Sequence, residues 1–139
     1  MSGLVLTLAP GESFIVNGAV LENGDRPSRI RVKDYDARVL RCSDAIKPED
    51  VDTPVKQVYF AIQLLITGDL EADATMPAIL KECAALEDIF SSIRPNAIPK
   101  LREMLSRENY YSALNYLKQV LALEATLLAH ANEQTRKVA

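Results

Sequence analysis

The hydrophobic pattern of this chain changes its period at Pro48, and this change constrains the fold more than any other feature. Before the proline, apolar and polar residues alternate in short runs separated by turn signals, as expected of antiparallel strands. After it, apolar residues recur every three or four positions, which is typical of amphipathic helices. We therefore predict an α+β fold, with an antiparallel β-module over residues 1–47 and an α-helical module of about four helices over residues 48–139.

The turn signals of the first part predict a meander of tight hairpins that forms one sheet over residues 4–41. Pro10-Gly11 supplies one turn, and Asn17-Gly18 and Asn23-Gly24 tolerate the positive φ angles that two-residue hairpins require. The candidate strands between these turns are Leu4–Leu8, Phe14–Val16, Ala19–Leu21, Ser28–Lys33 and Arg38–Arg41.

Capping signals place the helices of the second part. Thr53-Pro54 has the form of an N-cap followed by proline at the first helical position, and Gly68 suits the left-handed position after the helix. A second helix is expected from about Thr75 until Pro95 stops it. The remaining predictions are a shorter helix over Ile98–Leu105 and a long one from Asn109 toward residue 134.

The apolar arc of the last predicted helix is wider than one packing face requires. Because a monomer would leave part of this arc exposed to water, we expect a partner helix or a second copy of the chain to cover it. The candidate protein-partner residues are Leu117, Val120, Leu123 and Leu127.

Basic residues are concentrated in the part of the chain that is predicted to form strands. Within Ser28–Lys33, apolar side chains alternate with basic ones, so the basic ones share one face. The net charge of −3 argues against a protein that coats nucleic acid indiscriminately, so any RNA contact is expected to be local. The candidate RNA-binding residues are Arg29, Arg31, Lys33, Arg38 and Arg41; the alternative is an ordinary solvated strand face.

The sequence offers little for catalysis or for a cofactor. His130 is the only histidine, Cys42 and Cys83 form no CxxC pair, and the glycines are scattered singly without a phosphate-binding loop. The acids before the first helix are better explained by its dipole than by a metal. No apolar run reaches the roughly 18 residues of a membrane span. We therefore expect a cytoplasmic protein that is not an enzyme and holds no metal or other cofactor.

Several blocks of the chain resemble the FlbT family of flagellin regulators. They are Leu4–Glu12 (LVLTLAPGE), Phe14–Gly18 (FIVNG), Glu22–Asp25 (ENGD) and Thr53–Tyr59 (TPVKQVY). The resemblance implies a post-transcriptional regulator that binds the untranslated leader of flagellin mRNA and works with the small flagellar protein FlaF. In some members of the family the effect is repression, and in others activation.

The N-terminal 46 residues are also weakly similar to CsrA, a small β-sheet regulator of translation that binds RNA. In this alignment Arg41 matches an arginine of CsrA that is a principal RNA contact. Leu8 and Ala9 stand where CsrA has the arginine that follows its Leu-Thr pair and the neighbour of that arginine. The similarity thus favours Arg41 over the first strand as an RNA contact.

Two classes of function fit these patterns. In the first, the β-module contacts the flagellin mRNA leader and the helical module binds a FlaF-like flagellar protein or forms a homo-oligomer. In the second, the chain is a flagellar protein-interaction adaptor or a chaperone-like partner that affects RNA only indirectly. The basic strand face favours the first class, whereas the acidic net charge favours the second.

Overall fold

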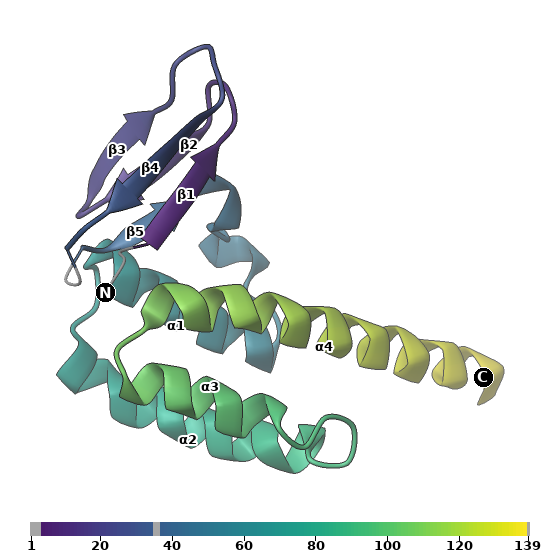
Figure 1. The fold of residues 1–139 in the computed structure, drawn as a ribbon. Helices are drawn as coiled ribbons and strands as arrows, with labels where there is room; N and C mark the ends of the chain where they lie inside the picture. Colours follow the sequence, from purple (N-terminus) through teal and green to yellow (C-terminus); the bar gives the residue numbers. More distant parts are fainter. Residues whose placement is uncertain (1–3, 35–36, 139) are drawn as a thin grey trace.

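A computed structural model describes residues 4–34 and 37–138 of the chain, with side chains described as far as Glu133. Antiparallel strands come first and long helices follow, which confirms the predicted α+β class (Figure 1). The strands are β1 (Leu4–Leu8), β2 (Ser13–Val16), β3 (Ala19–Glu22), β4 (Ser28–Val32) and β5 (Val39–Arg41). Two short 3-10 turns at Cys42–Asp44 and Pro48–Asp50 connect them to α1 (Pro54–Thr67), α2 (Ala72–Phe90), α3 (Ala97–Ser106) and α4 (Tyr110–Val138).

The predicted meander is wrong, because the strands do not pair in sequence order. β1 pairs with β4 as an antiparallel ribbon, while β2 lies between β3 and β5 in a separate sheet. The Asn17-Gly18 hairpin forms as predicted, with φ angles of 50° and 83°. Asn23-Gly24 does not form one, because the Asn23 side chain donates to the carbonyl oxygens of Ala9 at 2.8 Å and Arg26 at 2.9 Å. These bonds hold the chain as it crosses from the sheet to the ribbon.

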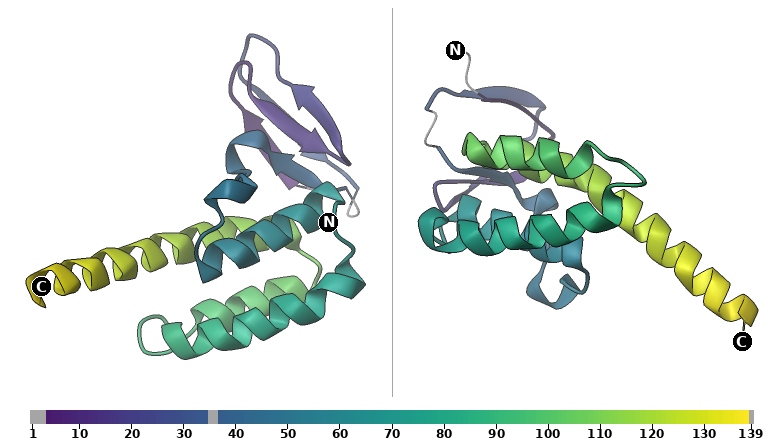
Figure 2. Two further views of the ribbon diagram at one scale, coloured as in Figure 1. Left: turned by 180° about the vertical axis from the view of Figure 1, so that it is seen from behind. Right: turned by 90° about the horizontal axis from the view of Figure 1, so that it is seen from below.

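The sheet lies between the ribbon and the helices. On one face, Phe14 and Val39 form an apolar cluster with Leu6 and Leu8 of the ribbon. On the opposite face, Leu40 is fully buried among the helical side chains, and its neighbour across the ladder, Ile15, packs against the same cluster. Figures 1 and 2 show the resulting arrangement, with the strands at one end of the molecule and α1 and α4 next to them.

Helix α1 follows its capping signals. The Thr53 hydroxyl accepts a hydrogen bond from the backbone N–H of Lys56 at 3.2 Å, and Gly68 adopts φ 86° after the last turn. Helix α2 departs from the prediction, since it begins at Ala72 rather than near Thr75 and ends at Phe90, before Pro95. Backbone bonds from Ile93 and Arg94 to the Phe90 carbonyl oxygen close that end as a turn.

The helices pack around one apolar core. Helix α1 contacts α2 and α4, and α3 contacts the same two helices from the other side. Buried side chains of all these helices fill the space between them, among them Ile62, Phe90, Leu101, Leu114 and Leu117. No helix within the described residues is long and apolar enough to cross a membrane. The second half of α4 extends away from the bundle (Figures 1 and 2).

Candidate functional site

The outer face of the β1–β4 ribbon carries the basic residues that were predicted from alternation. Arg29 lies opposite Thr7 in the ladder, and Arg31 lies opposite Val5. All of these side chains are exposed, whereas Ile30 between the two arginines packs toward the sheet. Since side chains alternate between the faces of a strand, Arg29 and Arg31 lie on the same face of β4.

This basic ribbon face, which we define as Val5, Thr7, Arg29 and Arg31, has a shallow hollow of about 270 Å³. Val5, Arg29, Ile30 and Arg31 line it. Neither arginine forms an ion pair or a side-chain hydrogen bond with another described residue. Lys33 follows the strand and is also exposed. Unpaired guanidinium groups beside an apolar side chain can accept phosphate oxygens or the face of a base.

Arg38 lies apart from the ribbon face. Its backbone N–H donates to Oδ1 of Asn17 at 2.9 Å, and its carbonyl oxygen accepts from the Asn17 N–H at 2.8 Å. Its guanidinium extends to the C-terminal end of α1, where a Cβ added at Gly68 would lie 3.0 Å from Nη1. A cation at this end is favoured by the helix dipole. The structure thus gives Arg38 a role within the fold.

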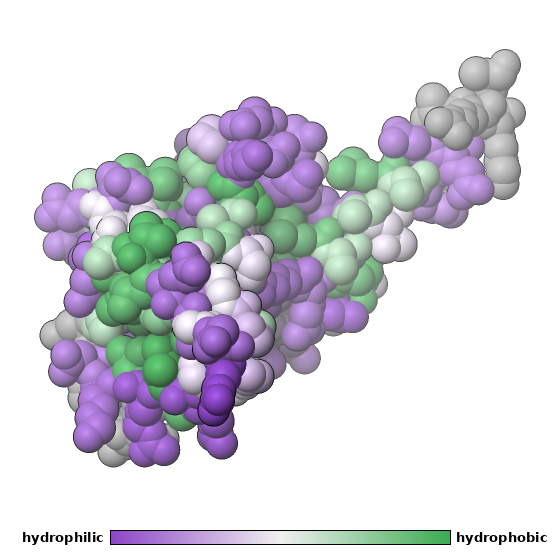
Figure 3. Space-filling view, turned by 90° about the horizontal axis from the view of Figure 1, so that it is seen from above, coloured by the Kyte–Doolittle hydropathy of each residue, from purple (hydrophilic) through white to green (hydrophobic). Residues whose placement is uncertain are grey.

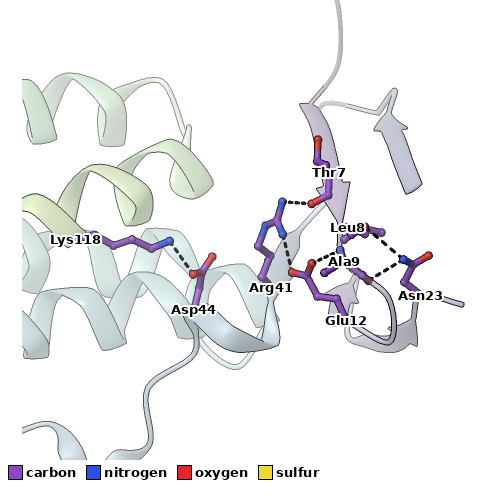
Figure 4. A network of polar contacts seen from close by, with 8 residues as sticks. All are labelled: Thr7, Leu8, Ala9, Glu12, Asn23, Arg41, Asp44 and Lys118. Atoms are coloured by element: carbon purple, nitrogen blue, oxygen red, sulfur yellow. Dashed lines mark hydrogen bonds and ion pairs between the residues drawn. The ribbon is translucent and has the colours of Figure 1, made fainter. Parts of the chain in front are cut away.

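Arg41 is held by intramolecular contacts (Figure 4). Its Nη1 donates to Oε2 of Glu12 at 2.6 Å, and its Nη2 donates to the Thr7 carbonyl oxygen at 2.8 Å. The other Glu12 oxygen accepts from the backbone N–H of Ala9 at 2.9 Å. Arg41 therefore ties β5 to the end of β1 and to the turn after it, and its side chain remains 24% exposed.

The protonation equilibria of this pair follow from the same contacts. The backbone N–H of Ala9, followed by the Arg41 guanidinium, lowers the pKa of Glu12 from its ordinary value. The Tyr111 hydroxyl, followed by the Glu12 carboxylate, raises the pKa of Arg41. Both groups are thus stabilised in the charged state, which favours the ion pair at neutral pH.

The predicted partner residues of α4 divide into buried and accessible ones. Leu117 and Val120 are 0% and 1% exposed, so they fill the core of their own helical bundle. Leu123 and Leu127 are half-buried at its margin, and Leu128 beyond them is 46% exposed. The wide apolar arc arises because α4 packs against both α1 and α3 in its first half.

A second hollow lies beside the accessible part of α4. It measures about 300 Å³ and is lined by Arg94 from the turn between α2 and α3 and by α4 residues Gln119, Ala122, Leu123 and Thr126. Figure 3 shows α4 extending beyond the rest of the molecule, with hydrophobic residues along it followed by hydrophilic ones. The apolar side chains of α4 that remain accessible to a protein partner are therefore Leu123, Leu127 and Leu128, next to this hollow.

Sequence reasoning missed Val5 and Thr7 as parts of the ribbon face. The alternation in Leu4–Leu8 indicates that these two residues share a face, but only the pairing of β1 with β4 brings that face beside the arginines. It also missed Glu124, whose side chain is 8% exposed and accepts hydrogen bonds from the Thr53 hydroxyl and, at 3.0 Å, from the Val55 N–H.

Thiols and acidic residues form no evident chemical site in the described part of the chain. No group of three or more His, Cys, Asp or Glu side chains among residues 4–34 and 37–138 is placed to hold a metal ion. Cys42 and Cys83 are free thiols, and burial raises the pKa of Cys83. A separate ion pair links Lys118 of α4 to Asp44 at 2.7 Å (Figure 4). Because Asp44 lies in the 3-10 turn after β5, this pair attaches that turn to the helical bundle.

Comparison with known proteins assigns the chain to a family. The family described as flagellar protein FlbT matches residues 4–128. A flagellum biosynthesis repressor protein FlbT of Caulobacter vibrioides is 30% identical over 93% of this chain and 92% of its own length. A probable repressor of the same name from Caulobacter sp. strain K31 is 27% identical over 93% of this chain and 98% of its own length. Another from Brucella abortus strain S19 is 30% identical over 88% of this chain and 80% of its own length. No solved structure matches at a significant level. The chain belongs to the FlbT family.

Proposed function

We propose that this chain is a regulatory protein, not an enzyme, that represses flagellum biosynthesis in the cytoplasm by binding the leader of flagellin mRNA. Its relatives are named as repressors of flagellum biosynthesis, which supports the direction of the effect. The observation that carries the RNA contact is the basic ribbon face, where Arg29 and Arg31 lie adjacent, exposed and without a partner among the described residues.

Of the predicted RNA contacts, Arg29, Arg31 and Lys33 are the principal ones in this proposal. Their positive charge is local within a chain of net charge −3, so binding depends on a few phosphates and on the bases between them. Arg38 and Arg41 act mainly by holding the strands in place, since the Arg38 backbone is hydrogen-bonded to Asn17 and the Arg41 side chain is paired with Glu12. Partly exposed Arg41 lies at the border of the same region and contributes one further donor.

The helical module binds a protein partner in this proposal. The accessible residues Leu123, Leu127 and Leu128 and the adjoining hollow offer a narrow apolar surface for one helix. A FlaF-like flagellar protein is the proposed partner, which leaves the strand end of the molecule free for RNA.

Binding of a labelled flagellin leader at near-physiological salt tests the RNA contact. The double variant Arg29→Ala/Arg31→Ala is expected to lose about tenfold or more in affinity and to show a flatter salt dependence, because each phosphate contact releases counterions. The matched control is Lys81→Ala/Arg107→Ala, which removes the same charge from α2 and from the turn after α3 and should change affinity less than about twofold. Equal binding by the two double variants would refute the proposed surface.

Arg41 separates a structural role from a contact role. Arg41→Ala is expected to lower the urea midpoint as well as RNA affinity, since it removes the ion pair with Glu12 and the bond to the Thr7 carbonyl oxygen. Arg29→Ala should leave the midpoint unchanged.

The adaptor alternative, favoured by the accessible leucines of α4, predicts weak and equal RNA binding by all variants and loss of regulation in Leu127→Asp instead.

A further inference from the structure

Strand β3 is an open apolar edge of the sheet. It pairs with β2 on one side, and no described strand pairs with its other side. All residues of Ala19–Glu22 are exposed, with Val20 at 70% and Leu21 at 41%. Figure 3, which views the molecule from the strand end, shows apolar side chains open to solvent over the β-module. An edge of this kind is a template for another strand unless it is blocked by charge, proline or a bulge.

The outward backbone groups of this edge follow from the hairpin. Val16 and Ala19 close the two-residue turn as a hydrogen-bonded pair, so the next pair, Ile15 and Val20, does not exchange hydrogen bonds. The N–H and C=O of Val20 consequently point away from β2. Unlike Ala19 and Leu21, Val20 therefore has a free donor and a free acceptor on the outer side.

We propose that a second copy of this chain adds to this edge, with its β3 antiparallel to the first and Val20 opposite Val20. A two-fold axis perpendicular to the sheet at Val20 gives two backbone hydrogen bonds between these residues. It also sets Ala19 opposite Leu21 of the other copy, and Glu22 opposite Gly18. Apolar side chains meet apolar ones, and the carboxylates do not face one another.

The register with Val20 opposite Val20 matches residue types across the interface better than the register with Leu21 opposite Leu21. A two-fold axis at Leu21 would place Val20 opposite the charged Glu22 of the second copy. In an antiparallel pair, residues directly opposite each other lie on the same face of the sheet. A two-fold axis midway between Val20 and Leu21 would pair residues of opposite faces, so this register is excluded. The charge and hydrophobicity of Ala19–Glu22 therefore select both the occupant and the alignment.

This pairing also fixes how the modules would be arranged. The face of the sheet that carries Phe14 packs on the ribbon, and the face that carries Leu40 packs on the helices. Because the perpendicular axis keeps like faces together, both basic ribbon faces would lie on one side of the joined sheet and both helical modules on the other. The dimer requires no RNA, so its failure and a failure of RNA binding are separate results.

Sedimentation of the purified full-length chain over a range of concentrations tests the proposal. We expect a monomer–dimer equilibrium in the micromolar range or weaker, because a four-residue edge is a small interface. Val20→Pro removes the outward N–H, fixes φ and breaks no hydrogen bond to β2, so it should weaken association at least tenfold. Val20→Thr, which keeps the N–H and a branched side chain, should stay within about threefold. Thermal unfolding followed by circular dichroism verifies that both variants are folded.

Leu128→Lys is the control for the interface, since it changes an exposed apolar residue on α4 and should leave the dimer intact.

The register is tested by Val20→Cys on a Cys42→Ser background, which should form a disulfide-linked dimer on mild oxidation. Hydrogen-bonded strand pairs have Cα atoms about 5.5 Å apart, within reach of a disulfide. Val5→Cys on the ribbon should not. A monomer at every concentration, or a dimer abolished by Leu128→Lys but unaffected by Val20→Pro, would overturn the proposal.

Discussion

At the residue scale, Glu124 shows how one side chain links distant parts of the chain. It lies on α4, yet its carboxylate accepts hydrogen bonds from the Thr53 hydroxyl and the Val55 N–H at the start of α1. The first N–H groups of a helix have no partner within the helix, and a negative charge there also complements the helix dipole. Glu124 therefore completes the cap that Thr53 begins.

Glu124→Ala is expected to lower the free energy of unfolding by about 1–3 kcal/mol, because it leaves the buried Val55 N–H without an acceptor. Urea unfolding followed by circular dichroism measures this loss. Glu133→Ala, an exposed residue further along the same helix, should stay within about 0.5 kcal/mol of the unchanged chain. A Glu124→Ala midpoint equal to that of the control would show that the cap does not contribute.

At the element scale, the C-terminal end of α1 is shared between the helix and the β-module. Gly68 has φ 86°, a conformation that side chains with a Cβ rarely adopt, and its N–H donates to the Leu65 carbonyl oxygen at 3.3 Å. Nη1 of Arg38 lies 3.0 Å from the position that a Cβ at Gly68 would take, which is a tight contact. One glycine therefore ends the helix and admits the cation that faces its carbonyl end.

Gly68→Ala should destabilise the chain by about 1 kcal/mol or more, since alanine is strained at this φ and its methyl group crowds the Arg38 guanidinium. The control is Gly24→Ala, because a Cβ at Gly24 meets no heavy atom within 4 Å and its φ is not positive. Thermal unfolding of the two variants makes the comparison. Comparable melting temperatures would contradict the role given to Gly68.

At the scale of the whole molecule, the strands and the helices share a core. Leu40 of β5 is 0% exposed and belongs to the apolar cluster of the helices. The side chain of Gln63 on α1 joins the two parts again, as it accepts from the Ile46 N–H at 2.8 Å and donates to the Ile46 carbonyl oxygen at 3.1 Å. We therefore expect one cooperative unfolding transition.

Leu40→Ala should lower the free energy of unfolding by about 2–5 kcal/mol, because it removes a buried side chain and leaves a cavity. Helix loss by circular dichroism and strand loss by amide resonances in NMR should remain coincident in urea. Val5→Ala, at a 38% exposed position of the ribbon, is the control and should have a small effect. Strand resonances that disappear well before the helical signal would disprove the shared core.

The sequence by itself determined what depends on neighbouring residues. The period change at Pro48, the Asn17-Gly18 hairpin and the Thr53 and Gly68 caps all form as predicted. Each rests on backbone preferences or on hydrogen bonds that span only a few residues, so the information lies within a short window. The alternation that placed Arg29 and Arg31 on one exposed face is local in the same sense.

Only the tertiary structure decided which distant residues meet. The pairing of β1 with β4 replaced the expected meander, because two strands with an apolar face gain more by covering the sheet than by extending it. The same packing buried Leu117 and Val120 within the bundle and engaged Arg41 with Glu12. A residue's type and period show that it has an apolar or charged face, whereas the partner of that face depends on contacts between segments far apart in the chain.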